Sequence, residues 1–219
     1  FFAPREPDKI KQIAKIAQNK KIPHIVNNAF GVQSRKIMKQ IKGAIDAGRV
    51  DAVIQSTDKN FLCPVGGAIA ASPNQEFLNA MSQVYAGRAT AAPIAQFLAA
   101  ILSMGVDGYE ELRSQQEENR GLLESALREV ADRHSQRILN VSNPVSVAMT
   151  LQGRDAKKIG KALYTARVNG ARALEKSDYG TCCPTYVSSY INFDAGIGMQ
   201  KKEIVLATER LDTVLKTVS

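Results

Sequence analysis

The alternation of helical and extended patterns limits the fold of this chain more than any other feature of its sequence. Apolar residues recur at helical spacing over 7–20 and 34–47, and short apolar runs over 22–26, 51–55 and 67–71 indicate strands. Helices that alternate with strands through short connections are typical of a parallel α/β sheet. Because the pattern begins on a helix, we expect earlier strands of the same sheet to precede Phe1, which makes the chain a fragment.

The second half of the chain carries a different pattern. A broken helical stretch over 74–104 leads into one long, charge-rich helical pattern over 107–133. The elements expected after it are a strand at 145–151, a helix at 155–167, strands near 171–174 and at 186–193, and a helix at 201–218. We therefore predict two domains: residues 1–105 as the C-terminal part of a large domain, and residues 106–219 as a small α+β domain.

Composition narrows the class of protein. No apolar run reaches the roughly 18 residues that a membrane span needs, and the first residues do not form a signal peptide. Three cysteines, two of them adjacent, argue against a disulfide framework, and two histidines allow no zinc site of usual spacing. We expect a cytoplasmic protein with reduced cysteines, no membrane association and no metal.

The chain is strongly basic. It has 29 Lys and Arg against 21 Asp and Glu, which gives a net charge of +8 and a pI near 9.4. A surplus of this size favours a polyanionic partner, because phosphates attract Lys and Arg over long distances. The alternative is a basic but ordinary surface, and charge alone does not decide between the two.

Lys59 stands in a polar turn between two predicted strands. Forming a Schiff base with an aldehyde needs a lysine in a desolvated cleft, and the end of a buried strand provides such a place. The neighbouring Gln55 and Ser56 can hydrogen-bond a cofactor phosphate, and the pair Gly66-Gly67 lets backbone approach closely. The alternative interpretation is a solvated loop lysine.

Asn27 and Asn28 end an earlier strand of the same predicted sheet. In open α/β sheets, ligands gather at the carboxyl ends of the strands. A pyridine cofactor needs a hydrogen-bonding group at its ring nitrogen, and a polar side chain that closes this strand can provide it. The alternative is that the two asparagines only make a turn.

Arg88 follows Gly87 at a break in a helical pattern and is flanked by small residues. A guanidinium with only small residues beside it suits bidentate binding of a phosphate. The alternative is an ordinary surface arginine.

Together these runs closely resemble the family of O-phosphoseryl-tRNA(Sec) selenium transferases, also known as the soluble liver antigen family. The resemblance is carried by Asn-Asn-Ala-Phe-Gly-Val-Gln-Ser (27–34), Gln-Ser-Thr-Asp-Lys-Asn-Phe (55–61), Pro-Val-Gly-Gly-Ala-Ile (64–69) and Gly-Arg-Ala-Thr-Ala-Ala-Pro (87–93). Segments at 2–8, 143–144, 148–151, 168–172 and 195–199 extend it over nearly the whole chain. It is loosest between about 173 and 186.

The resemblance implies a fold-type-I enzyme that uses pyridoxal 5′-phosphate (PLP) and assembles as a homotetramer with active sites at subunit interfaces. Such an enzyme converts O-phosphoseryl-tRNA(Sec) to selenocysteinyl-tRNA(Sec) by β-elimination of phosphate and addition of selenium from selenophosphate. By position, Lys59 becomes the Schiff-base lysine, Asn27 the partner of the pyridine nitrogen and Arg88 a ligand of the substrate phosphate. The family places further cofactor and substrate groups before Phe1, so we expect the isolated chain to be inactive.

Two arginines are predicted to contact tRNA. The family can carry an arginine directly after Thr165, where this sequence has Ala166 and then Arg167, so we transfer the role to Arg167. The stretch 35–49 is also basic, and we include Arg49 from it, although Asp46 interrupts this stretch.

Other functions stay open on the same residues. The nearest is another fold-type-I PLP enzyme, a decarboxylase or a desulfurase, and Cys182-Cys183 near Gly180 imitates the mobile cysteine that a desulfurase needs. The other is a non-catalytic fragment that binds tRNA or supports oligomerisation.

Overall fold

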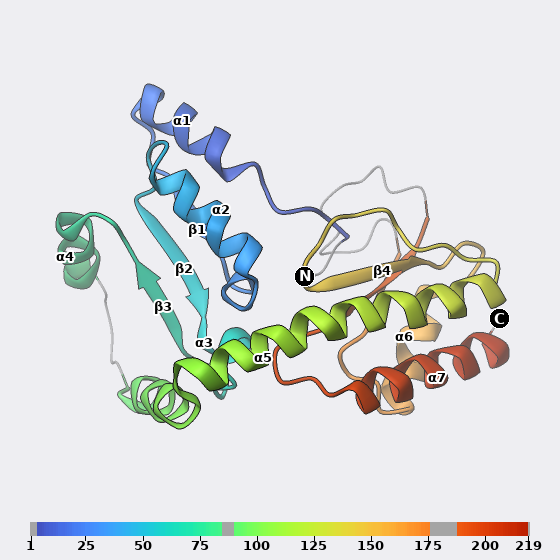
Figure 1. The fold of residues 1–219 in the computed structure, drawn as a ribbon. Coiled ribbons are helices and arrows are strands. Elements are labelled where there is room, and N and C mark those ends of the chain that lie inside the picture. The colour runs from blue at the N-terminus through green and yellow to red at the C-terminus, as the bar shows by residue number, and fades with distance from the viewer. Residues whose placement is uncertain (1–3, 85–89, 176–187, 219) are drawn as a thin grey trace. The chain divides into compact units, whose positions relative to one another are not determined.

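The computed structural model describes residues 4–84, 90–175 and 188–218. The chain divides into two compact units (Figure 1). One contains Pro7–Ser114, called the N-terminal unit below, and the other contains Phe1–Glu6 with Gln115–Ser219, called the C-terminal unit. Within the described residues, no helix has the length and apolar character required to span a bilayer.

The N-terminal unit is built on a three-stranded sheet in the order β1-β2-β3. Its elements are α1 (Ile10–Lys20), β1 (Ile25–Asn27), the 3-10 turn η1 (Gly31–Gln33), α2 (Arg35–Ile45), β2 (Ala52–Ser56), α3 (Thr57–Asn60), β3 (Ala68–Ala71), α4 (Gln75–Val84) and the start of α5. Helices α1 and α2 lie side by side over the sheet (Figure 1). Their inward residues pack with the two parallel strands into a small core of Ala14, Val26, Ile37, Ile41, Ala44, Val50 and Val53.

One part of the predicted sheet is wrong. Strands β1 and β2 are parallel, with Ile25 opposite Ala52, as the alternating pattern predicts. Strand β3, however, runs antiparallel to β2, with Ile54 opposite Ala70. The reason is the connection: only the 11 residues 57–67 lie between the two strands. A parallel crossover needs a dozen or more residues, so this chain turns back instead.

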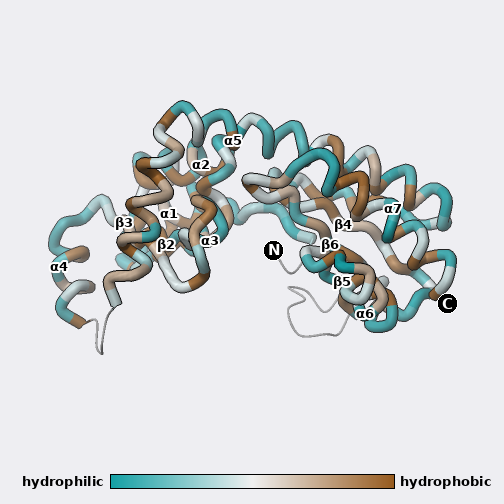
Figure 2. The backbone as a smooth tube through the Cα atoms, turned by 90° about the horizontal axis from the view of Figure 1, so that it is seen from below, coloured by the Kyte–Doolittle hydropathy of each residue, from teal (hydrophilic) through white to brown (hydrophobic). Residues whose placement is uncertain are grey.

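The C-terminal unit contains a second three-stranded sheet, which is antiparallel and has the order β4-β6-β5. Its elements are the end of α5, β4 (Ser146–Thr150), α6 (Ala156–Thr165), β5 (Arg172–Leu174), β6 (Tyr190–Asp194) and α7 (Lys201–Thr217). Apolar residues of β4 and β6 pack against the three helices, and Leu127, Met149 and Leu211 have no exposed surface. In Figure 2 the hydrophobic colour gathers along these strands.

Helix α5 (Ala92–Arg133) is interrupted at Gly105, whose φ of 64° and ψ of −176° are not helical. Only glycine adopts this backbone conformation readily, because in other residues the Cβ atom crowds the adjoining backbone at positive φ. The sequence predicts helical stretches that end at 104 and restart at 107, and the break lies between them.

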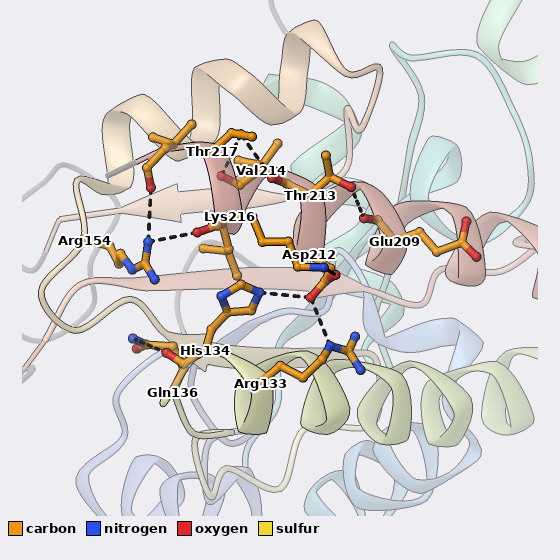
Figure 3. Close-up of polar contacts among 12 residues, drawn as sticks. Arg133, His134, Gln136, Arg154, Glu209, Asp212, Thr213, Val214, Lys216 and Thr217 are labelled. Carbon is orange, nitrogen blue, oxygen red and sulfur yellow. Dashed lines mark hydrogen bonds and ion pairs between the residues drawn. The ribbon is translucent and has the colours of Figure 1, made fainter.

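The carboxylate of Asp212 on α7 ties this helix to the end of α5 (Figure 3). It accepts hydrogen bonds from Lys216 Nζ at 2.5 Å, Arg133 Nε at 3.0 Å and His134 Nε2 at 2.9 Å. The hydrogen bond from Lys216 is the main cause that holds the pKa of Asp212 far below its usual value, and the bonds from Arg133 and His134 add to it. Partial burial of the carboxylate acts in the opposite direction.

Candidate cofactor site at the carboxyl ends of β1 and β2

Lys59 lies in the single turn of α3, which follows β2 without a connecting loop. Because β1 and β2 are parallel, their carboxyl ends, at Asn27 and Ser56, meet at the same edge of the sheet. The structure therefore places Asn27, Gln55, Ser56 and Lys59 in one region of the N-terminal unit. This is the kind of edge at which ligands bind in α/β folds.

The amine of Lys59 has three neighbours. Its Nζ atom lies 3.1 Å from Ser56 Oγ and 2.9 Å from Asp58 Oδ2, and 5.8 Å from the centre of the Phe30 ring. The side chain is 34% exposed, so it is neither free in solvent nor closed off. An amine in this position is oriented by its neighbours and still open to a ligand.

Asp58 is a site residue that the sequence analysis missed. Its carboxylate contacts Lys59 and also accepts a hydrogen bond from Ser56 Oγ at 2.9 Å. Burial raises the pKa of this carboxyl, but the hydrogen bonds from Lys59 and Ser56 outweigh burial and bring the pKa below its ordinary value. The amine is thus kept beside a negative charge. The only signal in the sequence was that the two residues are adjacent.

A second missed residue, Asn60, joins the lysine turn to the loop after β1. Its side chain has no exposed surface. Its Oδ1 atom accepts from the backbone N–H groups of Val32 at 3.1 Å and Gln33 at 3.3 Å. Its Nδ2 atom donates to the carbonyls of Ala29 at 2.8 Å and Ser56 at 2.7 Å. All four hydrogen-bonding positions of this amide are used, so it fixes the register of two segments at once.

Gln33 completes this connection from the opposite side. It is also fully buried, and its Nε2 atom donates to the backbone carbonyls of Phe30 at 3.1 Å and Lys59 at 3.2 Å. The ring of Phe30 is the one that faces the Lys59 amine. Two neutral, buried amides thus hold the backbone that presents the lysine.

Gly67 allows its backbone to approach Thr57 closely, whereas the sequence predicts a close approach to a cofactor. A Cβ atom at this position would lie 2.4 Å from Oγ1 of Thr57, which is buried. The backbone carbonyl of Gly67 also accepts from the N–H of Thr57 at 3.1 Å. The glycine therefore lets β3 close against the start of α3, next to Lys59.

Asn27 shows the turn contact expected on the simpler interpretation. Its Oδ1 atom accepts from the N–H of Ala29 at 3.2 Å, and the residue is exposed. Among the described residues, no hydrogen bond from its amide nitrogen is found. Both interpretations of Asn27 are compatible with this geometry, because the turn uses the oxygen and leaves the donor for a ligand.

The predicted tRNA residues lie elsewhere. Arg49 precedes β2, at the opposite end of the strand from Lys59, and its Nε lies 2.8–2.9 Å from both oxygens of Asp51. Asp51 also accepts from the N–H of His24 at 2.7 Å. Arg167 follows α6 in the C-terminal unit and is exposed. A tRNA contact stays a prediction for both arginines.

Arg88, Cys182 and Cys183 lie outside the described residues, so the structure adds nothing to the predictions made for them. Among the residues that are described, no group of three or more His, Cys, Asp or Glu side chains could hold a metal ion.

Comparison with known proteins decides the family. Residues 1–216 match the family model described as O-phosphoseryl-tRNA(Sec) selenium transferase. The chain belongs to this family. A selenium transferase from Methanopyrus kandleri is 40% identical over 219 residues, which are 99% of this chain and 51% of the relative. One from Dictyostelium discoideum is 36% identical and covers 96% of this chain. The chain spans about half the length of these curated relatives.

Solved structures confirm the predicted fold class. The crystal structure of an archaeal O-phosphoseryl-tRNA(Sec) selenium transferase aligns with 97% of this chain at a TM-score of 0.92 and 37% identity, and the match covers 49% of that protein. The cysteine desulfurase CsdA of Escherichia coli aligns with a TM-score of 0.69 at 15% identity, which shows a shared fold alone. The fold is that of the fold-type-I PLP-dependent transferases.

Proposed function

We propose that the protein containing this chain converts O-phosphoseryl-tRNA(Sec) to selenocysteinyl-tRNA(Sec) with selenophosphate, and that it uses PLP bound at Lys59. The observation that carries the proposal is the position of the Lys59 amine at the carboxyl end of β2, in a chain that matches the selenium transferase family over residues 1–216. The proposal includes a homotetramer in the cytoplasm, as the resemblance implies.

The side chains around Lys59 fit this cofactor. The amine is partly exposed and oriented by Ser56 and Asp58, as covalent attachment to an aldehyde requires. The amide nitrogen of Asn27, at the end of the neighbouring strand, would donate to the pyridine nitrogen. Ser56 and Gln55 would contribute to binding of the cofactor phosphate. When bound, PLP supplies an electron sink for loss of the α-proton and of the β-phosphate.

The pyridine partner has a chemical consequence. A donor amide, in contrast to a carboxylate, favours a ring nitrogen that carries no proton. We infer that Asn27 holds the cofactor as a weaker electron sink, which suits elimination from a substrate already activated as an ester.

Lys59 and Asp58 would share the proton chemistry. Once its amine is free, Nζ of Lys59 takes the proton from the α-carbon of the phosphoseryl group as general base. The carboxylate of Asp58, 2.9 Å away, stabilises the ammonium ion formed in that step. Arg88 would bind the substrate phosphate and stabilise the charge that develops as it leaves.

Borohydride reduction tests the position of the cofactor. The complete protein that carries these 219 residues should be yellow, and reduction should fix the cofactor to the peptide that contains Lys59. Lys36 provides the internal control, because it lies in the same unit on α2. A label on Lys36, or on any lysine other than Lys59, would contradict the proposal.

Turnover of two substrates tests the reaction itself. Phosphoseryl-tRNA should be a much better substrate than free phosphoserine. Arg88→Ala should lower the turnover of phosphoseryl-tRNA by about two to three orders of magnitude. Arg88→Lys should recover only part of this loss, because a point charge lacks the planar fork. The exposed Arg128, replaced by Ala, is the matched control. If free amino acid were the better substrate, the function would be that of another PLP enzyme.

A further inference from the structure

The net charge of this chain comes entirely from one segment. Residues 7–49 contain ten Lys and Arg and two Asp, a surplus of +8, which equals the net charge of the whole chain. Residues 50–219 contain 18 basic and 18 acidic residues, and residues 1–6 contain one of each. The basic segment consists of α1, β1, η1 and α2 with their connections. Neither α1 nor α2 contains a carboxylate.

Many cations of this segment are not neutralised within the fold. Arg35, Lys42 and Arg49 pair with Glu110, Asp46 and Asp51 respectively. Among the described residues, no ion pair is found for the exposed side chains of Lys9, Lys11, Lys15, Lys20, Lys21 and Lys39. Lys11 and Lys15 are one helical turn apart, where like charges repel and weaken the helix. An external anion would remove this repulsion.

Four of these lysines line one groove. Lys9, Lys11 and Lys15, at and near the start of α1, and Lys39 on α2 surround a groove of about 620 Å³ within the N-terminal unit. Gln12, Gln40 and Gly43 also line it, and so does the acidic residue Asp8. The exposed lining of the groove is mostly apolar, and Ile10 belongs to it, so the ammonium groups and amides of these residues are its polar part, on two helices that lie side by side (Figure 1).

We propose that the groove between α1 and α2 binds the sugar–phosphate backbone of RNA. Ammonium groups act as point charges for phosphates, and glutamine amides can donate to phosphate oxygens or pair with the 2′-hydroxyl of ribose. Lysine contacts of this kind position a nucleic acid without reading its sequence. The identity of the RNA as a tRNA rests on the proposed function, and the groove is separate from the residues around Lys59.

RNA fits these observations better than other anions do. A flat anionic membrane contacts convex surfaces, where an amphipathic helix places its apolar side in the lipid, whereas these lysines line a concavity. An acidic peptide would be bound through arginine forks in preference to lysines. Both alternatives enter the test as competitors.

A triple variant and a matched control test the groove in the complete protein. Lys11→Ala, Lys15→Ala and Lys39→Ala are combined, and the control combines Arg128→Ala, Lys201→Ala and Lys202→Ala, which changes the net charge equally. The control residues are exposed, and two of them already face carboxylates. Binding of the tRNA is measured over a series of KCl concentrations.

The groove variant should bind tRNA about tenfold to a hundredfold more weakly at 0.15 M salt. The negative slope of log affinity against log salt should become shallower by about two to three. The control should change affinity by less than about threefold. Absorbance of the bound cofactor should be equal in all forms, and the KM for phosphoseryl-tRNA should rise in the groove variant and not in the control.

Two outcomes overturn the proposal. One is unchanged affinity and slope in the groove variant, or equal losses in the groove variant and the control. The other is stronger competition for the groove by a polyglutamate peptide or by phosphatidylserine vesicles than by tRNA. If instead neither variant nor the unmodified protein bound tRNA at all, the proposed function would fail. If the unmodified protein bound tRNA and the groove variant bound it equally well, the groove proposal would fail and the proposed function would stand.

Discussion

The two units of this chain are stabilised in different ways. Among the described residues, the C-terminal unit buries a cluster of eighteen hydrophobic side chains, whereas the corresponding cluster of the N-terminal unit contains seven. Helix α4 of the N-terminal unit has no buried residue. Yet this unit holds Lys59, and around it the buried side chains are polar: Gln33, Thr57 and Asn60. The comparison teaches that the candidate site depends on complete hydrogen bonding, while the other unit depends on apolar packing.

The largest expected effect concerns the packed core. Leu127→Ala should lower the free energy of unfolding of the C-terminal unit by about 2–5 kcal/mol, because Leu127 has no exposed surface and its removal leaves a cavity. Hydrogen exchange measured by mass spectrometry should then be faster in β4, α6 and α7, and should stay unchanged in residues 25–60 of the N-terminal unit. Leu122→Ala on the same helix, at a position that is 43% exposed, should have little effect. Faster exchange around Lys59 in the Leu127 variant would break the distinction between the units.

A slightly smaller effect is expected at Asn60. Asn60→Ala leaves two N–H groups and two carbonyls without their partner, and each unsatisfied buried group costs about 1–3 kcal/mol, reduced where water can enter. We expect the free energy of unfolding of the N-terminal unit to fall by roughly 2–4 kcal/mol. Hydrogen exchange at the amides of Val32 and Gln33 should be faster, and PLP should be retained less well. Asn79→Ala, at an exposed position on α4, is the control. Unchanged exchange at these two amides would show that packing, and not Asn60, fixes the lysine turn.

The third prediction concerns pH. Because the folded-state pKa of Asp212 lies below its usual value of 3.8, its ion pairs contribute fully above about pH 4. The contribution is lost as the pH falls from there toward the folded-state pKa, by about 1.4 kcal/mol for each pH unit at most. Asp212→Asn should lower the stability of the C-terminal unit by about 1–3 kcal/mol at pH 7, and should lower it less at pH 3.

Urea unfolding at both pH values measures this difference. Asp132→Asn, at an exposed position of α5, should leave the stability unchanged at both pH values. An equal loss at pH 7 and pH 3 would show that the contacts of Asp212 with Lys216, Arg133 and His134 do not depend on its charge.

The sequence predicted the course of the chain better than it predicted the contacts around Lys59. Periodicity located the helices and strands, including the interruption near Gly105, because these depend on local apolar patterns and on glycine. The antiparallel direction of β3 was missed, although the short connection from Ser56 was visible. The roles of Asn60 and Gln33 could not be predicted, since each of them also bonds to partners that lie 26 to 31 residues away in the chain. Asp58 was overlooked because an acidic neighbour in a polar turn is usually solvated.

Helix α5 carries a consequence for how such a sequence can change over generations. A continuous helix links the rotational phase of all its residues, so that one inserted or deleted residue turns every later side chain by about 100°. The interruption at Gly105 separates that phase into two parts. A single-residue insertion before Gly105 can therefore be absorbed without turning Leu123 and Leu127 out of their core. The cost is that position 105 itself favours glycine, because its φ of 64° strains any residue that has a side chain.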